Sequence, residues 1–203
     1  MARTKSRFVC QECGYVASSW LGRCPECGGW NTLVEEAEVT AKASKSYLPA
    51  NNEKLRPRTI ASVAQTKVER LATGIREFDR VLGGGVVPGS LVLLGGTPGI
   101  GKSTILLDAG LRFGQQGIKV LYVSGEESEE QTAMRAVRLG GAQANDNLLI
   151  LTATDLDAIL AQANALKPQL LIIDSIQTMY NPELQTAAGS VGQVRECTAK
   201  LLQ

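Results

Sequence analysis

The stretch GTPGIGKS, at 96–103, constrains this chain more than any other part of the sequence. It fits the pattern G-x-x-x-x-G-K-[ST] without a mismatch, and it lies between an apolar run at 90–96 and a segment with helical spacing. Glycines let the backbone turn tightly, so that successive N–H groups point at phosphate oxygens, and a helix N-terminus adds its positive dipole end. The motif therefore predicts a nucleotide phosphate site in an α/β fold, whereas a chance match would lack this strand–turn–helix context.

The residues of this loop have separate expected roles. The Lys102 ammonium would reach the β- and γ-phosphates, and the Ser103 hydroxyl would hold Mg²⁺. We therefore expect ATP and Mg²⁺ as ligands. The predicted nucleotide contacts are Gly95, Gly96, Thr97, Pro98, Gly99, Ile100, Gly101, Lys102, Ser103 and Thr104.

Strand-like and helix-like segments alternate from about Thr59 onward. Short apolar runs favour buried parallel strands, and longer segments with apolar residues three or four apart favour helices. We expect Ser128 to cap one helix and Pro168 to end another. The expected strands cover 90–96, 119–127, 147–153 and 169–175, and the expected helices cover 102–117, 128–141, 155–167 and 190–203. Repeated units of this length predict an α/β fold, a parallel sheet with helices on both faces.

Three carboxylates follow the ends of expected strands. Asp174 closes the apolar run LLIID, at the edge of the sheet where α/β proteins bind ligands, and there it can accept from the magnesium shell. Glu126 and Glu127 lie at the end of another strand, so one of them could act as general base over the γ-phosphate. Alternatively, Asp174 is a turn cap and the glutamates are solvated acids at a helix start.

Four of the five cysteines lie within 18 residues, as C-x₂-C, a ten-residue spacer and C-x₂-C. The glycines that follow Cys13 and Cys27 suit the left-handed bend of a metal knuckle. Four thiolates match a closed, structural Zn²⁺ site, and an iron–sulfur or redox role is the alternative. The predicted zinc ligands are Cys10, Cys13, Cys24 and Cys27.

The remaining cysteine and the tryptophans allow different interpretations. We expect Cys197 to pack as a small apolar side chain. Trp20 and Trp30, with Arg23, flank the cysteine pairs. They form either a recognition surface, because aromatics beside arginine stack on bases or proteins, or the core that so small a domain needs.

Composition limits the remaining classes of function. The chain lacks histidine, so catalysis must use carboxylates, lysine, hydroxyls and a metal ion. Its formal net charge of +1 argues neither for nor against nucleic acid. No apolar run approaches the about 18 residues of a membrane span, and the N-terminus lacks the apolar stretch of a signal peptide. We therefore expect a cytoplasmic protein without a membrane segment.

Composition also divides the chain into three zones. We expect a C4 zinc ribbon at 1–34, a polar, alanine-rich linker at 35–58, and a P-loop ATPase domain at 59–203.

Taken together and in this order, four stretches resemble the bacterial RadA (Sms) family of DNA repair ATPases, in the RecA superfamily. They are FVCQECGYVASSWLGRCPECGGWNTL, GIREFDRVLGGGVVPGSLVLLGGTPGIGKST, VLYVSGEES and LLIIDSIQTM…GSVGQVREC. The similarity runs from Arg7 to the last residue. It implies a RecA-like core behind a small zinc ribbon.

By this resemblance, Glu126 is the water-activating glutamate, in preference to Glu127. Lys102, Ser103 and Asp174 match the phosphate lysine, the magnesium hydroxyl and the acid of the second nucleotide motif. Residues 74–85 match the segment that contacts neighbouring subunits. Residues 181–193 fall where the family places its first DNA-facing loop, although their composition also suits a plain mobile loop.

The family implies a hexameric ring, a homo-oligomer that binds single-stranded and branched DNA. Such a ring couples ATP hydrolysis to branch migration in repair and homologous recombination. The zinc ribbon would then be an interaction module for a recombinase or for DNA.

The resemblance also implies parts that this sequence does not contain. Family members continue with a core strand, a second DNA loop, a Lys-Asn-Arg-Phe-Gly motif and a domain resembling the Lon protease fold. The missing strand lies between the phosphate-loop strand and the Asp174 strand. We therefore expect an N-terminal fragment with a truncated sheet, poorly stable and weak or inactive as an ATPase by itself.

Three other functions remain open at this level. The chain could be a RecA-superfamily ATPase that acts on proteins in signalling or regulation, which DNA would not stimulate. It could be a zinc adaptor that binds nucleotide without turnover, against which Glu126 argues. A nucleotide kinase fits worst, because no arginine-rich lid follows the phosphate loop.

Overall fold

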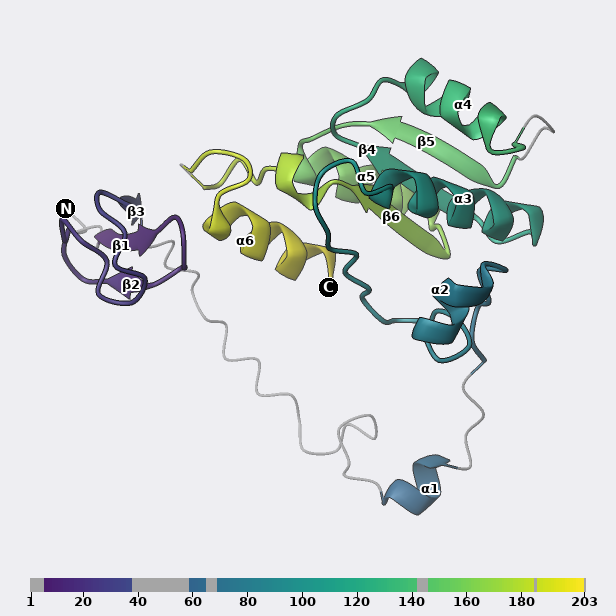
Figure 1. Ribbon diagram of the computed structural model, residues 1–203, viewed down its shortest axis with the longest axis horizontal. Helices are drawn as coiled ribbons and strands as arrows, with labels where there is room; N and C mark the ends of the chain where they lie inside the picture. The colour runs from purple at the N-terminus through teal and green to yellow at the C-terminus, as the bar shows by residue number, and fades with distance from the viewer. Residues whose placement is uncertain (1–5, 38–58, 65–68, 142–145, 185, 203) are drawn as a thin grey trace. The chain divides into compact units, whose positions relative to one another are not determined.

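The computed structural model describes residues 6–37, 59–64, 69–141, 146–184 and 186–202 (Figure 1). Two compact units are distinguished within the chain, one made of Met1–Glu38 and Leu91–Gln203 and the other of Val39–Ser90. The predicted linker at 35–58 falls almost wholly outside the described residues, so the domain boundaries stay a prediction.

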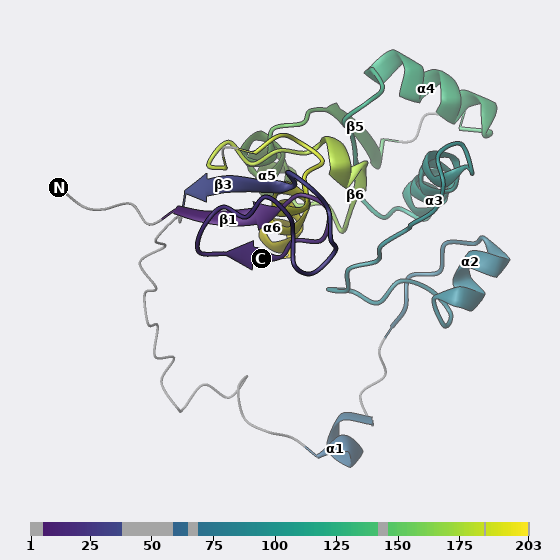
Figure 2. The same ribbon diagram turned by 60° about the vertical axis from the view of Figure 1, so that its left-hand side comes forward.

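The cysteine-rich region forms a small antiparallel sheet. Its strands are β1 (Ser6–Cys10), β2 (Val16–Ala17) and β3 (Leu33–Ala37), in the order β2-β1-β3. Figure 2 shows β1 and β3 side by side, in a register that places Cys10 opposite Leu33. The buried cluster consists of Cys10, Ala17, Cys24 and Leu33, with Phe8 and Tyr15 against it. So few apolar side chains make a weak core, which makes a metal the expected source of stability.

The tryptophans do not belong to that core. Trp20 is 56% exposed and Trp30 is 71% exposed. The Arg23 guanidinium lies over the Trp30 ring, 5.7 Å from its centroid. Of the two interpretations, the structure supports the exposed aromatic surface rather than the core role.

The larger region contains a three-stranded parallel sheet (Figure 1). The strands are β4 (Val120–Ser124), β5 (Leu148–Thr152) and β6 (Leu170–Asp174), in the order β5-β4-β6. Ser124 pairs with both Thr152 and Asp174, so the carboxyl ends of all three strands are level. All five residues of β4 are buried, as expected for the central strand.

Helices cover both faces of this sheet. On one face, a Cβ added to Gly110 of α3 (Lys102–Gln115) would lie 3.4 Å from Ile172 of β6. On the other, Leu121 and Val123 pack with α5 (Leu156–Leu166) and α6 (Val191–Leu201). α4 (Glu129–Arg138) follows β4 and contacts α3 and β5. The predicted RecA-like α/β architecture is confirmed.

Local sequence features explain where these helices begin. The Ser128 side chain accepts from the Gln131 N–H and Gln131 reciprocates, a capping box that confirms the predicted N-cap of α4. The Asp155 and Ser190 side chains cap α5 and α6 by accepting from the N–H groups of Ala158 and Gln193, without the reciprocal bond. Cys197 of α6 is fully buried in the apolar cluster, as predicted, and burial raises the pKa of its thiol.

The strand predicted at 90–96 is wrong. These residues form no strand, and the side chains of Leu91, Val92 and Leu93 are 55%, 44% and 81% exposed. A β-strand exists only by pairing, and none of the described strands pairs with this segment. The apolar residues of this segment are therefore not part of either described sheet.

The second unit contains α1 (Ile60–Ala64) and α2 (Arg76–Val81). Leu71 pairs with Val86 across the turn that includes α2. The Asp79 carboxylate accepts from the N–H groups of Thr73 at 2.7 Å and Gly74 at 3.0 Å. Although burial raises the pKa of Asp79, these hydrogen bonds leave it below its ordinary value. The subunit contact expected for 74–85 stays a prediction.

Candidate functional site

The phosphate loop wraps around the start of α3. Gly99 has φ +77° and Gly101 has φ +102°, both in the left-handed region that favours glycine. Gly101 is the N-cap of α3, so the free N–H groups of the first helical turn face the loop. The Lys102 ammonium donates to the carbonyls of Gly96 at 2.8 Å and Thr97 at 3.0 Å. Lys102, the predicted phosphate-binding lysine, therefore lies against the phosphate loop.

Asp174 is hydrogen-bonded through both of its carboxylate oxygens. The Ser103 hydroxyl donates to Oδ1 at 3.0 Å, which joins the two predicted magnesium residues across 71 positions of sequence. The Tyr122 phenol donates to Oδ2 at 2.5 Å. A hydroxyl and a carboxylate are the hard oxygen donors that Mg²⁺ prefers, so the residues fit this ion.

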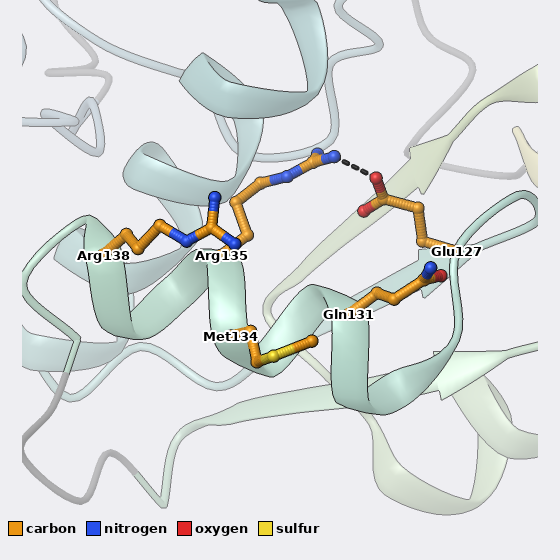
Figure 3. A pocket seen from close by; sticks show the side chains of 5 residues that line it. All are labelled: Glu127, Gln131, Met134, Arg135 and Arg138. Atoms are coloured by element: carbon orange, nitrogen blue, oxygen red, sulfur yellow. Dashed lines mark hydrogen bonds and ion pairs between the residues drawn. The ribbon is translucent and has the colours of Figure 1, made fainter.

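The two glutamates after β4 have different surroundings. Glu126 accepts from the Ser175 hydroxyl at 3.0 Å, and Ser175 directly follows Asp174. Glu127 forms an ion pair with Arg135 of α4, as the dashed line in Figure 3 shows. Its backbone is also held by the Ser124 hydroxyl, at 3.0 Å from its N–H and 2.9 Å from its carbonyl. Glu127 thus has a charged partner, whereas Glu126 is held by a hydroxyl, and the role of Glu126 as general base stays a prediction.

A shallow pocket lies along α4 beside this ion pair (Figure 3). The side chains of Gln131, Met134 and Arg138 line it together with Glu127 and Arg135. In Figure 3, Arg135 extends from α4 toward Glu127. The ion pair therefore ties α4 to the turn that carries Glu126.

Gly125 lies where the turn after β4 meets the turn after β6. Its N–H donates to the Asp174 carbonyl at 2.9 Å. A Cβ at this position would lie 1.9 Å from Thr178 Oγ1 and 2.8 Å from Met179 Cε. Thr178 belongs to the short 3₁₀ helix η2 (Ile176–Thr178). Only glycine fits between the two segments without displacing η2.

Replacing Gly125 with alanine is therefore expected to destabilise the fold by about 1–3 kcal/mol, the usual cost of overpacking. Thermal and urea denaturation of the variant would measure the loss. Gly95→Ala is the matched control, because a Cβ at Gly95 meets nothing within 4 Å. Equal stability of the two variants would contradict the close packing of Gly125 on η2.

The predicted DNA loop is anchored by a buried glutamine. The Gln193 side chain accepts from the Asn181 N–H at 2.8 Å and donates to the carbonyls of Asn181 at 3.3 Å and Thr186 at 2.9 Å. Lys200 of α6 donates to Glu183 at 2.8 Å, and this hydrogen bond lowers the pKa of the Glu183 carboxyl. Contact of 181–193 with DNA stays a prediction.

The four predicted zinc ligands lie together. Their sulfur atoms are all within 4.8 Å of one another, and the Cys10–Cys27 and Cys13–Cys24 pairs are each 3.6 Å apart. Tetrahedral Zn–S bonds of about 2.3 Å would separate sulfurs by about 3.8 Å, so the cage fits one ion. Such a cage is too compact for a multi-iron cluster, whose ligands bind separate irons.

Local geometry supports this cage. Gly14 and Gly28, which follow the second cysteine of each pair, have φ +76° and +74°, the predicted left-handed bends. The Thr32 hydroxyl lies 3.2 Å from Cys10 Sγ, and its hydrogen bond lowers the pKa of the Cys10 thiol to about 6. A lowered pKa favours the thiolate, which is the form that ligates a metal.

Sequence reasoning missed Tyr122, Ser175 and Gln193. Tyr122 was readable in part, because a phenol inside the apolar run VLYV needs a hydrogen-bond partner when it is buried. Its partner was not readable, since Asp174 lies 52 positions away. Ser175 and Gln193 lie within the stretches that carry the resemblance, but no pattern in the sequence assigns either of them a hydrogen-bond partner.

Within the described ranges, no helix has both the length and the apolar content that crossing a bilayer requires.

Two family models match the chain. The model described as an AAA domain matches residues 53–201, and the model described as a rubredoxin metal binding domain matches residues 8–35. The first covers the phosphate loop, Glu126 and Asp174, and the second covers all four clustered cysteines. The nucleotide domain and the metal domain inferred from the residues are thus both confirmed, with ATP, Mg²⁺ and Zn²⁺ as the matching ligands.

Curated relatives are similar along the whole of this chain. Proteins named DNA repair protein RadA are 49% identical in Halalkalibacterium halodurans, 47% in Bacillus subtilis and 46% in Listeria monocytogenes. Each match covers 100% of this chain and 44% of the relative. The resemblance to the RadA family is confirmed, and the chain spans less than half the length of these relatives.

Proposed function

The chain belongs to the AAA domain family, and from that premise we propose that it is a DNA-dependent ATPase of DNA repair and homologous recombination. The observation that carries the proposal is the junction of Ser103 and Asp174, with Glu126 beside them through Ser175. Relatives named as DNA repair proteins, 46–49% identical, support the biological role.

Each residue of the site has a part in the proposed hydrolysis. Mg²⁺ supplies positive charge that offsets the charge developing on the phosphate oxygens. Ser103 and Asp174 would hold that ion, and Lys102 would neutralise the β- and γ-phosphates. Glu126 accepts the proton of the attacking water, and the Ser175 hydroxyl keeps its carboxylate oriented. Backbone N–H groups of 96–103 bind the phosphates as the reaction proceeds.

The DNA-directed part of the proposal concerns residues 181–193. They follow η2, which begins next to Ser175, so a change at Glu126 would reach this loop through the hydrogen bond to Ser175 and a short stretch of chain. We place single-stranded and branched DNA at this loop, in a hexameric ring that promotes branch migration of recombination intermediates. The cytoplasm is the expected compartment.

The zinc ribbon is proposed to be an interaction module. Its exposed Trp20 and Trp30 and its Arg23–Trp30 contact offer a rigid aromatic surface, the kind of surface that dominates recognition energy. A recombinase is the proposed partner, with DNA as the other outcome. Fluorescence from the only two tryptophans of the chain reports directly on this surface.

Steady-state ATP hydrolysis, with and without single-stranded DNA, tests the proposal. We expect DNA to stimulate turnover, with a stimulation that falls steeply as salt rises, because phosphate contacts release counterions. Lys102→Ala should lower turnover by about 10²-fold or more, since one charge-stabilising group is lost. The measurement should compare this chain with a version of the relatives' full length, because we expect the short chain to be weak alone.

ATP turnover that DNA does not stimulate would indicate an ATPase that acts on proteins. Nucleotide binding without any turnover in the long form would indicate a zinc adaptor that uses nucleotide as a structural ligand. Arg112→Ala provides a matched control, because Arg112 lies on α3 but pairs with Asp108 on the helix surface. It should leave turnover unchanged.

A further inference from the structure

We propose that Tyr122 is a positioning residue for the magnesium site, holding the Asp174 carboxylate in the orientation that receives the ion together with Ser103. The inference rests on the proposed ATPase function and adds to it a residue that belongs to neither nucleotide motif. Tyr122 comes from the middle of β4, a different strand from the one that carries Asp174.

The contact fixes the rotation of a carboxylate. Rotation of an aspartate about χ2 is broad, so one hydrogen bond leaves the plane of the carboxylate free to swing. In this structure, Ser103 holds Oδ1 at 3.0 Å and Tyr122 holds Oδ2 at 2.5 Å. With both oxygens held from different elements, the lone pairs of Asp174 that remain have a set direction.

The support for the Tyr122 phenol is rigid. Tyr122 is 1% exposed and pairs in register with Ile172 of β6, two positions before the pairing of Ser124 with Asp174. Its side chain spans that distance toward the carboxyl end of the sheet, where Asp174 lies. β4 is paired on both sides and buried throughout, so the phenol has little freedom to move.

The hydroxyl is not needed for packing. The neighbouring residues of the strand, Leu121 and Val123, are aliphatic, and phenylalanine would fill nearly the same volume as Tyr122. Burying a hydroxyl costs free energy unless it is hydrogen-bonded, and the bond to Asp174 offsets that cost. A tyrosine phenol carries its proton at neutral pH, so Tyr122 acts as the donor in this contact.

The test is Tyr122→Phe, measured as ATP turnover against free Mg²⁺ and as affinity for a fluorescent ATP analogue in EDTA. We expect the half-saturating Mg²⁺ concentration to rise about tenfold, the usual effect of removing a group that orients a metal ligand. Metal-free nucleotide affinity should stay unchanged. A merely structural role would weaken the response to Mg²⁺ and the metal-free nucleotide affinity together, or would change neither.

Tyr180→Phe is the matched control. The nearby Asp155 carboxylate raises the pKa of the Tyr180 phenol, so the substitution removes a phenol beside an aspartate, away from the phosphate loop. It should leave the Mg²⁺ dependence at the wild-type value. An unchanged Mg²⁺ dependence in Tyr122→Phe, with active wild-type protein, overturns the inference and leaves the proposed function intact.

A double-mutant cycle covers the case in which Tyr122→Phe is less stable. In an Asp174→Asn background, Mg²⁺-dependent nucleotide binding should not change further when Tyr122 is replaced, because the phenol acts through the carboxylate. Additive effects would overturn the inference. A wild-type protein that binds no nucleotide with Mg²⁺ would overturn the proposed function as well.

Discussion

Replacing Glu126 with glutamine is expected to lower ATP turnover by about 10²–10⁴-fold, the range for loss of a general base. Glutamine keeps the size and the hydrogen bond from Ser175 but cannot accept the proton of the attacking water. Nucleotide affinity should change little, because the hydrogen bond described for this carboxylate is to Ser175, which is neither in the loop 96–103 nor expected to hold Mg²⁺. Single-turnover hydrolysis and equilibrium binding of an ATP analogue would separate the two effects.

The adjacent glutamate supplies the control for this experiment. Glu127→Gln removes an equal charge from the next position, but Glu127 is engaged by Arg135. Its loss should cost little stability, since partly exposed ion pairs contribute about 0–1 kcal/mol. The reverse pattern, with Glu127→Gln inactive and Glu126→Gln active, would transfer the base assignment to Glu127. Two active variants would argue against any carboxylate base in this turn.

Removing the metal from the ribbon is expected to unfold residues 8–34 completely. Structural Zn²⁺ contributes about 10–16 kcal/mol in small domains of this kind, and the buried cluster of Cys10, Ala17, Cys24 and Leu33 cannot replace it. Treatment with a chelator, or Cys10→Ser, should therefore collapse the two tryptophan indole signals in a proton–nitrogen NMR spectrum. Those two signals come only from Trp20 and Trp30.

Measuring the zinc content of the protein completes this experiment, with a variant of the fifth cysteine, Cys197, as the control. Elemental analysis should find one zinc per chain in the wild type and in Cys197→Ala, because Cys197 lies in the apolar cluster of the α/β core. Cys10→Ser should hold much less zinc. Bound iron in place of zinc would correct the metal, and an ordered ribbon without any metal would show that the small core suffices.

Sequence patterns predicted the features of this fold that depend on neighbouring residues. The start of a helix at Ser128 could be predicted because capping acts within one turn of a helix. The phosphate loop was readable because glycines and a lysine at fixed spacing serve one short turn. The glycines after Cys13 and Cys27 were readable for the same reason.

Features that depend on residues distant in the sequence could not be predicted. The segment 90–96 has the composition of a strand, yet strand formation requires a partner that composition does not specify. Likewise, the partners of Asp174 and Glu126 lie 52 and 49 positions away in Tyr122 and Ser175. The exposure of Trp20 and Trp30 also depends on which side chains fill the ribbon core, and other side chains fill it: Cys10, Ala17, Cys24 and Leu33.

The buried Gln193 side chain has a consequence for the thermodynamics of anything that binds residues 181–190. Three hydrogen bonds from one amide fasten the backbone at Asn181 and Thr186, so the backbone at these two positions is held before a ligand arrives. Fixing a free backbone costs about 1–2 kcal/mol per residue in conformational entropy. Folding has already met that cost here, so a ligand of this loop gains affinity by preorganisation without additional contacts.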